Sequence, residues 1–201
     1  MEKIKLGPQV LLYPAVALIG SNVNKKPNFM TVSWCTMGAL KPPSVAFPMN
    51  RLRYTLKGIK ENGTFSVNIV SCDMAKKTDY CGIYSGKNKD KSQIFNPFYG
   101  VLGTAPLIQE CPLNMECKTI HYLDLGSHFL IVGEVIETYL TERCITDGKP
   151  DPIKIDPLIY ITRTMKYYHL GELVASAFNI GKESDDLRPA EAVLGDCLKG
   201  K

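Results

Sequence analysis

Between residues 31 and 36 the chain gathers side chains suited to binding a flat, phosphorylated molecule. The stretch holds two threonines, a serine, a cysteine and the one tryptophan of the sequence: Thr31, Ser33, Trp34, Cys35 and Thr36. Hydroxyl groups and the N–H groups of a strand bind polar ligand atoms, and an indole ring covers a planar ring. The same pattern also fits a core strand with a buried Trp34, because tryptophans are usually well buried.

A second cluster of polar side chains lies where an apolar strand pattern gives way to a helical one. It contains Asn50, Arg51, Arg53 and Thr55. The first N–H groups of a helix point outward and its dipole favours an anion, and an arginine adds a permanent charge. This cluster therefore predicts a phosphate site, although both arginines also fit the solvated start of a helix.

A third cluster lies in a loop rich in glycine, serine and lysine, and its candidate ligand residues are Ser85, Gly86, Asp90 and Lys91. A phosphate needs several donors and some positive charge, and this loop offers both. A run of lysines is also typical of a loop that simply faces water. Each cluster is unspecific when it is taken alone.

The elements that position the first two clusters follow from the spacing of apolar residues. Residues 11–23 predict a strand, and a polar turn at 24–27 joins it to a second strand that begins at residue 28, which indicates a hairpin. Residues 44–49 predict a third strand. The apolar residues then recur at helical spacing from Leu52 until Asn62 and Gly63 end the helix.

The second half of the chain is mostly strand-like. Alternating residues predict a strand at 64–70, and a helix capped by Ser71 or Asp73 is expected at 71–80. Long strands are expected at 113–123 and 128–140, and short strands at 158–160 and 166–169. These make six or seven strands without a βαβ series. The expected fold class is mainly β, an antiparallel barrel with helical insertions.

Composition limits the function classes. A chain of 201 residues with 45% hydrophobic composition buries a sizeable core. Its net charge of +4 suits an anionic small molecule and does not require a nucleic acid. A barrel that binds nucleic acid through Tyr80, Tyr84 and the lysines of the 85–91 loop is the alternative from a different class.

The cysteines and the chain start predict a cytoplasmic protein without a membrane partner. Seven cysteines are an odd and scattered set with no Cys-x-x-Cys pair, so neither a disulfide framework nor a metal site is expected. The first residues lack the apolar core of a signal peptide. The longest apolar run, residues 10–19, contains Pro14 and is too short to cross a bilayer.

Taken together and in order, five motifs resemble the flavin reductase-like, FMN-binding split-barrel family, and most closely its flavoredoxin branch. The similarity covers roughly residues 8 to 170. The motifs are Met30-Thr31-Val32-Ser33-Trp34 leading to Pro42-Pro43, the helix entry at 50–55, Phe65-x-Val67-Asn68, Ser85-Gly86 with Asp90-Lys91, and Gly133-Glu134-Val135.

This resemblance implies a Greek-key split β-barrel, a homodimer and one FMN per subunit. It places Thr31, Ser33, Trp34, Cys35 and Thr36 along the isoalloxazine and ribityl side of the cofactor. It assigns Asn50, Arg51 and Thr55 to the phosphate or nearby groups. Ser85, Gly86, Asp90 and Lys91 would close the site.

The resemblance further implies a flavin-dependent oxidoreductase whose electrons come from NAD(P)H or from a redox partner protein. The histidine segment that many family members use for nicotinamide has no clear match among His121, His128 and His169. A non-catalytic FMN carrier that serves a partner protein therefore stays open as an alternative. The family domain is expected over residues 1–180, followed by a polar tail at 181–201 with a possible helix at 190–198.

Overall fold

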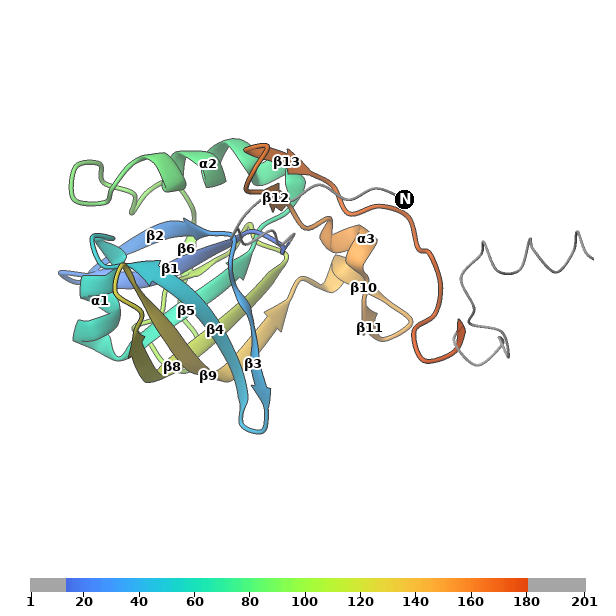
Figure 1. The fold of residues 1–201 in the computed structure, drawn as a ribbon, viewed down its shortest axis with the longest axis horizontal. Helices are drawn as coiled ribbons and strands as arrows, with labels where there is room; N and C mark the ends of the chain where they lie inside the picture. The colour runs from blue at the N-terminus through green and yellow to red at the C-terminus, as the bar shows by residue number, and fades with distance from the viewer. Residues whose placement is uncertain (1–13, 181–201) are drawn as a thin grey trace, which may run out of the picture. The chain divides into compact units, whose positions relative to one another are not determined.

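The computed structural model describes residues 14–180, and its largest element is an antiparallel sheet of seven strands (Figure 1). In sheet order β2-β1-β5-β8-β9-β4-β3, the strands are β2 (Lys26–Val32), β1 (Ala17–Val23), β5 (Thr64–Ile69), β8 (Leu113–Asp124), β9 (His128–Leu140), β4 (Pro43–Asn50) and β3 (Thr36–Leu40). All neighbouring strands are antiparallel.

The two edge strands of this sheet, β2 and β3, follow each other in the chain. Only residues 33–35 join them. A link this short spans about 3.5 Å per residue, so the two edges lie close together although they are at opposite ends of the strand order. The sheet must therefore curl into a barrel with a split between β2 and β3, and the predicted split barrel is confirmed.

Helices and short strands surround this sheet. Helix α1 (Thr55–Asn62) packs on β1, and α2 (Ala75–Ile83) packs on β2. The remaining elements are η1 (Cys72–Met74), β6 (Pro97–Phe98), β7 (Leu107–Ile108), η2 (Glu142–Cys144), β10 (Ile145–Thr146), β11 (Lys149–Pro150), α3 (Pro152–Ile155), β12 (Ile159–Ile161) and β13 (Lys166–Tyr168). No helix in residues 14–180 is long and apolar enough to cross a membrane.

Two apolar clusters form the core. Inside the barrel, the rings of Phe47 and Phe65 meet edge to face with centroids 5.2 Å apart. Gly133 on β9 permits this packing, because a Cβ there would overlap the Phe65 ring. The second cluster lies under α2, where Phe29 and Phe95 pack with centroids 5.5 Å apart. Both clusters contain side chains of β2 and of strands next to it. This packing holds β2 in place and thereby determines where the split lies.

Most predicted elements agree with the structure, and the main differences are the start of α1 and the separate strand β3. The hairpin of β1 and β2 and the long strands β8 and β9 are confirmed. Helix α1 ends where predicted, since Gly63 adopts φ 66°. It begins later than expected, because Asn50 accepts hydrogen bonds from the N–H groups of Leu52 and Arg53 and holds residues 50–53 in a turn.

Three further predictions concern the expected strand from residue 28, the helix at 71–80 and the tail. The strand prediction did not separate β3 from β2. The helix extends to Ile83 and begins with the short η1. The unit that contains the barrel ends at Leu170, and residues 171–180 belong to a second unit. Residues 1–13 and 181–201, with the possible helix at 190–198 and the start of the first strand, lie outside the described residues.

Strand β8 carries a buried charged side chain, that of Glu116. Glu116 is fully buried and accepts hydrogen bonds from the N–H groups of Val101 and Leu102, both at 2.8 Å, and from the hydroxyl of Tyr139 at 2.7 Å. Hydrogen bonds to the carboxylate raise the pKa of Tyr139 above its usual value. These contacts fasten the 99–104 loop to the outside of the barrel.

We expect Tyr139→Phe to lower the free energy of unfolding by about 1.5 kcal/mol, because a hydrogen bond to a buried carboxylate is lost. Urea unfolding followed by circular dichroism measures this. Tyr122→Phe is the matched control, since Tyr122 is partly exposed and its hydroxyl contacts the Ile59 carbonyl at 3.4 Å. Equal stability losses in the two variants would contradict the prediction.

Candidate functional site

A polar cleft of about 540 Å³ opens at the split of the barrel. It brings together five of the predicted site residues from three separate segments: Thr31, Ser33, Trp34, Asn50 and Ser85. Its other walls come from Met30, Val32, Pro48, Leu52, Arg53, Ile83 and His128. We call this site the polar cleft; its volume is in the usual range for a small-molecule site.

Arg53 gives the polar cleft its positive charge. Its guanidinium donates to the Gly82 carbonyl at 3.1 Å, at the end of α2. Within residues 14–180 no carboxylate lies within ion-pair distance of this guanidinium. Burial and, to a smaller extent, the charge of Arg53 lower the pKa of Lys91, which does not line the polar cleft. The guanidinium of Arg53 is therefore the positive charge that favours an anionic ligand in the polar cleft.

Arg51, the arginine predicted to bind phosphate, has different partners. Its guanidinium forms an ion pair with Asp124 and donates to the Gly126 carbonyl in the β8–β9 turn. It also lies 4.4 Å from the centre of the Phe129 ring. The hydrogen bond from Arg51 lowers the pKa of Asp124 below its usual value. The structure thus ties Arg51 to the sheet, outside the polar cleft.

Lys91 is buried, with 3% of its surface exposed. Its ammonium donates to the carbonyls of Phe29 at 3.0 Å and Cys81 at 2.9 Å. These bonds join β2 to the last turn of α2. Lys91 is therefore removed both from the polar cleft and from the basic surface that a nucleic acid would contact.

The remaining predicted residues of the second and third clusters do not line the polar cleft, and Gly86 and Asp90 line a separate pocket of about 360 Å³. Thr55 is buried in the first turn of α1 and accepts a hydrogen bond from the Asn28 amide at 2.7 Å. Gly86 packs against Asn28, since a Cβ at this position would overlap its amide oxygen. Asp90 is exposed, 3.7 Å from the ammonium of Lys26. The Ser92 hydrogen bonds lower the pKa of Asp90.

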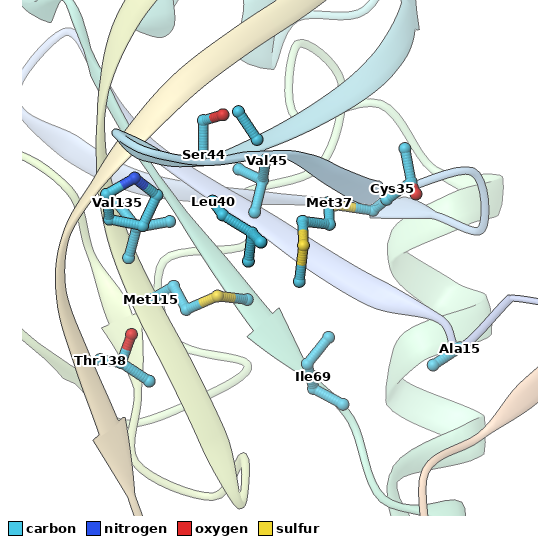
Figure 2. A pocket seen from close by; sticks show the side chains of 13 residues that line it. Ala15, Cys35, Met37, Leu40, Ser44, Val45, Ile69, Met115, Val135 and Thr138 are labelled. Carbon is cyan, nitrogen blue, oxygen red and sulfur yellow. The ribbon is translucent and has the colours of Figure 1, made fainter. Parts of the chain in front are cut away.

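Cys35 and Thr36 line a different cavity, an apolar pocket of about 390 Å³. Figure 2 shows Met37 and Leu40 from β3 facing Ile69 and Met115 across this pocket. The chain therefore changes environment within the link of residues 33–35: Ser33 and Trp34 face the polar cleft, whereas Cys35 faces apolar side chains.

Two polar or charged residues that line the polar cleft were absent from the predicted set, Arg53 and His128. Arg53 belonged to the second polar cluster, but no feature of the sequence favoured it over Arg51. His128 lies opposite Asn50 in the pairing of β4 with β9, and its ring centre is 6.3 Å from that of Trp34. Only knowledge of the strand register places it beside the first cluster.

Comparison with known proteins identifies the family of this chain. The family model described as "Flavin reductase like domain" matches residues 12–169. The chain belongs to the flavin reductase-like family. The predicted family is thus confirmed, and the match covers the barrel together with β12 and β13.

Within the flavin reductase-like family, solved flavoredoxins are very similar to this chain. The flavoredoxin of Methanosarcina acetivorans is 41% identical with a TM-score of 0.88, covering 91% of this chain and 99% of that one. That of Desulfovibrio vulgaris (Miyazaki F) is 36% identical with a TM-score of 0.83, covering 90% and 100%. An FMN-binding protein of Thermus thermophilus, 21% identical with a TM-score of 0.75 over 88% and 99%, shares the fold. The predicted flavoredoxin branch is confirmed.

The polar cleft fits the cofactor that the flavin reductase-like family implies. FMN needs a surface for a flat ring, donors for a hydroxylated chain and a positive charge for one phosphate. Trp34 and Met30 provide apolar surface, Ser33 and Ser85 provide hydroxyl groups, and Arg53 provides the charge. The residues present therefore suit this group.

Cys35 is expected to be chemically inert in the native protein. Burial raises its pKa to about 12, so it remains a thiol at pH 8, and the thiolate is the reactive form. Alkylation by iodoacetamide should be at least about tenfold slower than in the urea-unfolded chain, as peptide mapping can measure. Equal rates in the native and unfolded protein would contradict this.

The described cysteines also agree with the prediction that no disulfide framework exists. Six of the seven are free in the structure: Cys35, Cys72, Cys81, Cys111, Cys117 and Cys144. Cys197 lies outside the described residues.

Proposed function

We propose that this flavin reductase-like protein binds one FMN in the polar cleft and transfers electrons through it. The observation that carries the proposal is the Arg53 guanidinium, which lines the polar cleft with only a backbone carbonyl as its partner among the described residues. A permanent charge in such a place favours a phosphate. FMN supplies the oxidation and reduction chemistry when it is bound.

The protein's own part is to position the cofactor and to control its surroundings. Trp34 is 43% exposed, which leaves its ring accessible to a planar partner. Ser33, Ser85 and the Asn50 amide lie around the same cleft and are suited to the polar atoms of the ligand. None of these groups needs to act as an acid or base for electron transfer, and we assign no catalytic residue.

The first test is identification of the bound flavin. The purified protein should be yellow, and heating should release FMN, which chromatography separates from FAD and riboflavin. Recovery of FAD alone, or of no flavin after reconstitution with FMN, would refute the proposal.

The electron donor distinguishes an enzyme from a carrier. We propose a flavin-dependent oxidoreductase that takes electrons from NAD(P)H or from a redox partner protein. Steady-state oxidation of NADH and NADPH by the FMN-loaded protein separates these cases. Turnover supports a reductase, whereas anaerobic reduction by a protein donor alone supports a carrier.

We further propose a homodimer. Met37 and Leu40 on the edge strand β3 are 67% and 76% exposed beside the apolar pocket, and a second subunit would cover them. Light scattering should report a dimer, and Leu40→Glu should shift it to a monomer, whereas the adjacent Lys41→Glu should not. A wild-type monomer at micromolar concentration would contradict this proposal.

We also propose a reducing, cytoplasmic location. The free thiols of the six described cysteines support it, because disulfides form mainly in oxidising compartments. Cell fractionation with an antibody against the native chain tests this.

A further inference from the structure

Three potential metal ligands converge away from the polar cleft, at the turn before α2. They are Cys72, Asp156 and His169, and one ligand atom of each lies within 4.8 Å of the other two. Nδ1 of His169 and Oδ1 of Asp156 lie 3.0 Å apart. None of these residues lines the polar cleft.

The backbone holds two of these residues in fixed register. The N–H of Cys72 donates to the carbonyl of Asp156 at 3.0 Å, and the neighbouring residues Ser71 and Pro157 form a β-bridge. Asp156 caps α3 in a left-handed conformation with φ 47° and ψ 56°. Such a conformation is uncommon for a residue other than glycine. Here the backbone N–H of Asp156 donates to the carbonyl of Pro152, which stabilises it.

The third residue arrives on a different element. His169 follows directly after β13, which pairs with β12. The thiol of Cys72 contacts the carbonyl of Tyr168 at 3.9 Å, which places the end of β13 beside the Cys72 turn. Cys72 and, more than 80 positions later, Asp156 and His169 thus present a sulfur, an oxygen and a nitrogen to one point.

We propose that Cys72, Asp156 and His169 form a binding site for a divalent zinc-like cation. A thiolate, an imidazole and a carboxylate are all zinc ligands, and their combination suits a borderline-soft metal better than Mg²⁺ or Ca²⁺, which prefer oxygen. Three protein ligands leave one position of a tetrahedron for water. All three side chains are at least partly exposed, so the cation has an entry path.

A cation at this site would hold β13 in place next to the polar cleft. β13 carries Tyr167, whose hydroxyl donates to Asp79 at 2.9 Å. Tyr167, Tyr160 and Met165 line a compartment of about 340 Å³ that shares Thr31, Ser33 and Arg53 with the polar cleft. A cation that joins His169 to the Cys72 turn therefore holds β13 in place at the edge of that compartment.

Equilibrium dialysis of the untagged full chain against Zn²⁺ tests the site directly. We expect one Zn²⁺ per chain, in the presence and absence of FMN. Cys72→Ser and His169→Ala should each weaken binding by at least about 10- to 100-fold, the loss typical of disturbing even a supporting residue of a metal site. His121→Ala is the control, because His121 is an exposed histidine on β8, and it should bind Zn²⁺ like the wild type.

X-ray absorption of the Zn²⁺-loaded wild type keeps the test independent of how the variants fold. One sulfur at about 2.3 Å with nitrogen and oxygen neighbours supports the site. A shell of nitrogen and oxygen alone would overturn the proposal. So would unchanged stoichiometry and affinity in Cys72→Ser, or a loss in His121→Ala equal to that in His169→Ala.

Discussion

Replacing Arg53 with alanine should weaken FMN binding about 10- to 100-fold, which corresponds to the loss of a charge-assisted contact worth about 1.5–3 kcal/mol. The reason is that Arg53 lines the polar cleft without a carboxylate partner among the described residues. Fluorescence titration of the apoprotein with FMN measures the change. Riboflavin, which lacks the phosphate, should lose much less affinity.

Arg51→Ala is the matched control, since it removes the same side chain two positions earlier. Arg51 is paired with Asp124 in the β8–β9 turn, so its removal should change FMN affinity by less than about threefold. A large loss in Arg51→Ala with none in Arg53→Ala would show that Arg51 binds the phosphate, as the sequence predicts. Equal losses for FMN and riboflavin would mean that Arg53 supports the fold or the ring.

Lys91→Met should lower the free energy of unfolding by about 2–4 kcal/mol. The variant leaves the carbonyls of Phe29 and Cys81 without their buried donor, and hydrogen bonds to charged groups are worth about 1.5–3 kcal/mol each. The saved cost of burying an ammonium offsets part of this loss. Urea unfolding of the apoprotein gives the value without a contribution from ligand binding.

Lys89→Met provides the control for Lys91→Met, because Lys89 is exposed in the same loop. It should change stability by less than about 0.5 kcal/mol. If Lys91→Met were as stable as the wild type but bound FMN far more weakly, Lys91 would be a cofactor ligand, as the sequence suggested.

The buried Lys91 ammonium also predicts the direction in which the free energy of unfolding changes with pH. Burial lowers its pKa in the folded state, so folding disfavours the protonated form. Keeping the Lys91 ammonium protonated in the fold offsets part of what its hydrogen bonds contribute at neutral pH, and this cost is relieved as pH rises from the folded pKa toward the usual value of 10.5.

The alternation of apolar and polar residues, together with the turn residues, was sufficient to predict most of the fold. The strand at 128–140 coincides with β9, and the end of α1 follows from a glycine that can adopt positive φ. β3 was not separated because all five of its residues are exposed and Gly38 interrupts the alternation. No core-facing pattern exists there for a sequence to reveal.

The candidate site was harder to predict because its residues depend on register and on turn geometry. Arg51 and Arg53 are equivalent as sequence features, and only the turn at residues 50–53 directs one toward Asp124 and the other toward Gly82. His128 joins the polar cleft solely through its pairing opposite Asn50. Among the proposed metal ligands, Cys72 lies more than 80 positions before Asp156 and His169, and the three show no spacing typical of a metal motif.

The link of residues 33–35 has a consequence for how this protein is made on the ribosome. Its flanking strands β2 and β3 are synthesised one after the other, yet β3 joins the sheet only through β4, and β4 pairs with β9. In a nascent chain the β3–β4 hairpin therefore has no neighbouring strand until residues 128–134 of β9 have emerged. We expect that flavin is captured only after this point, and that chaperones meet the hairpin before it.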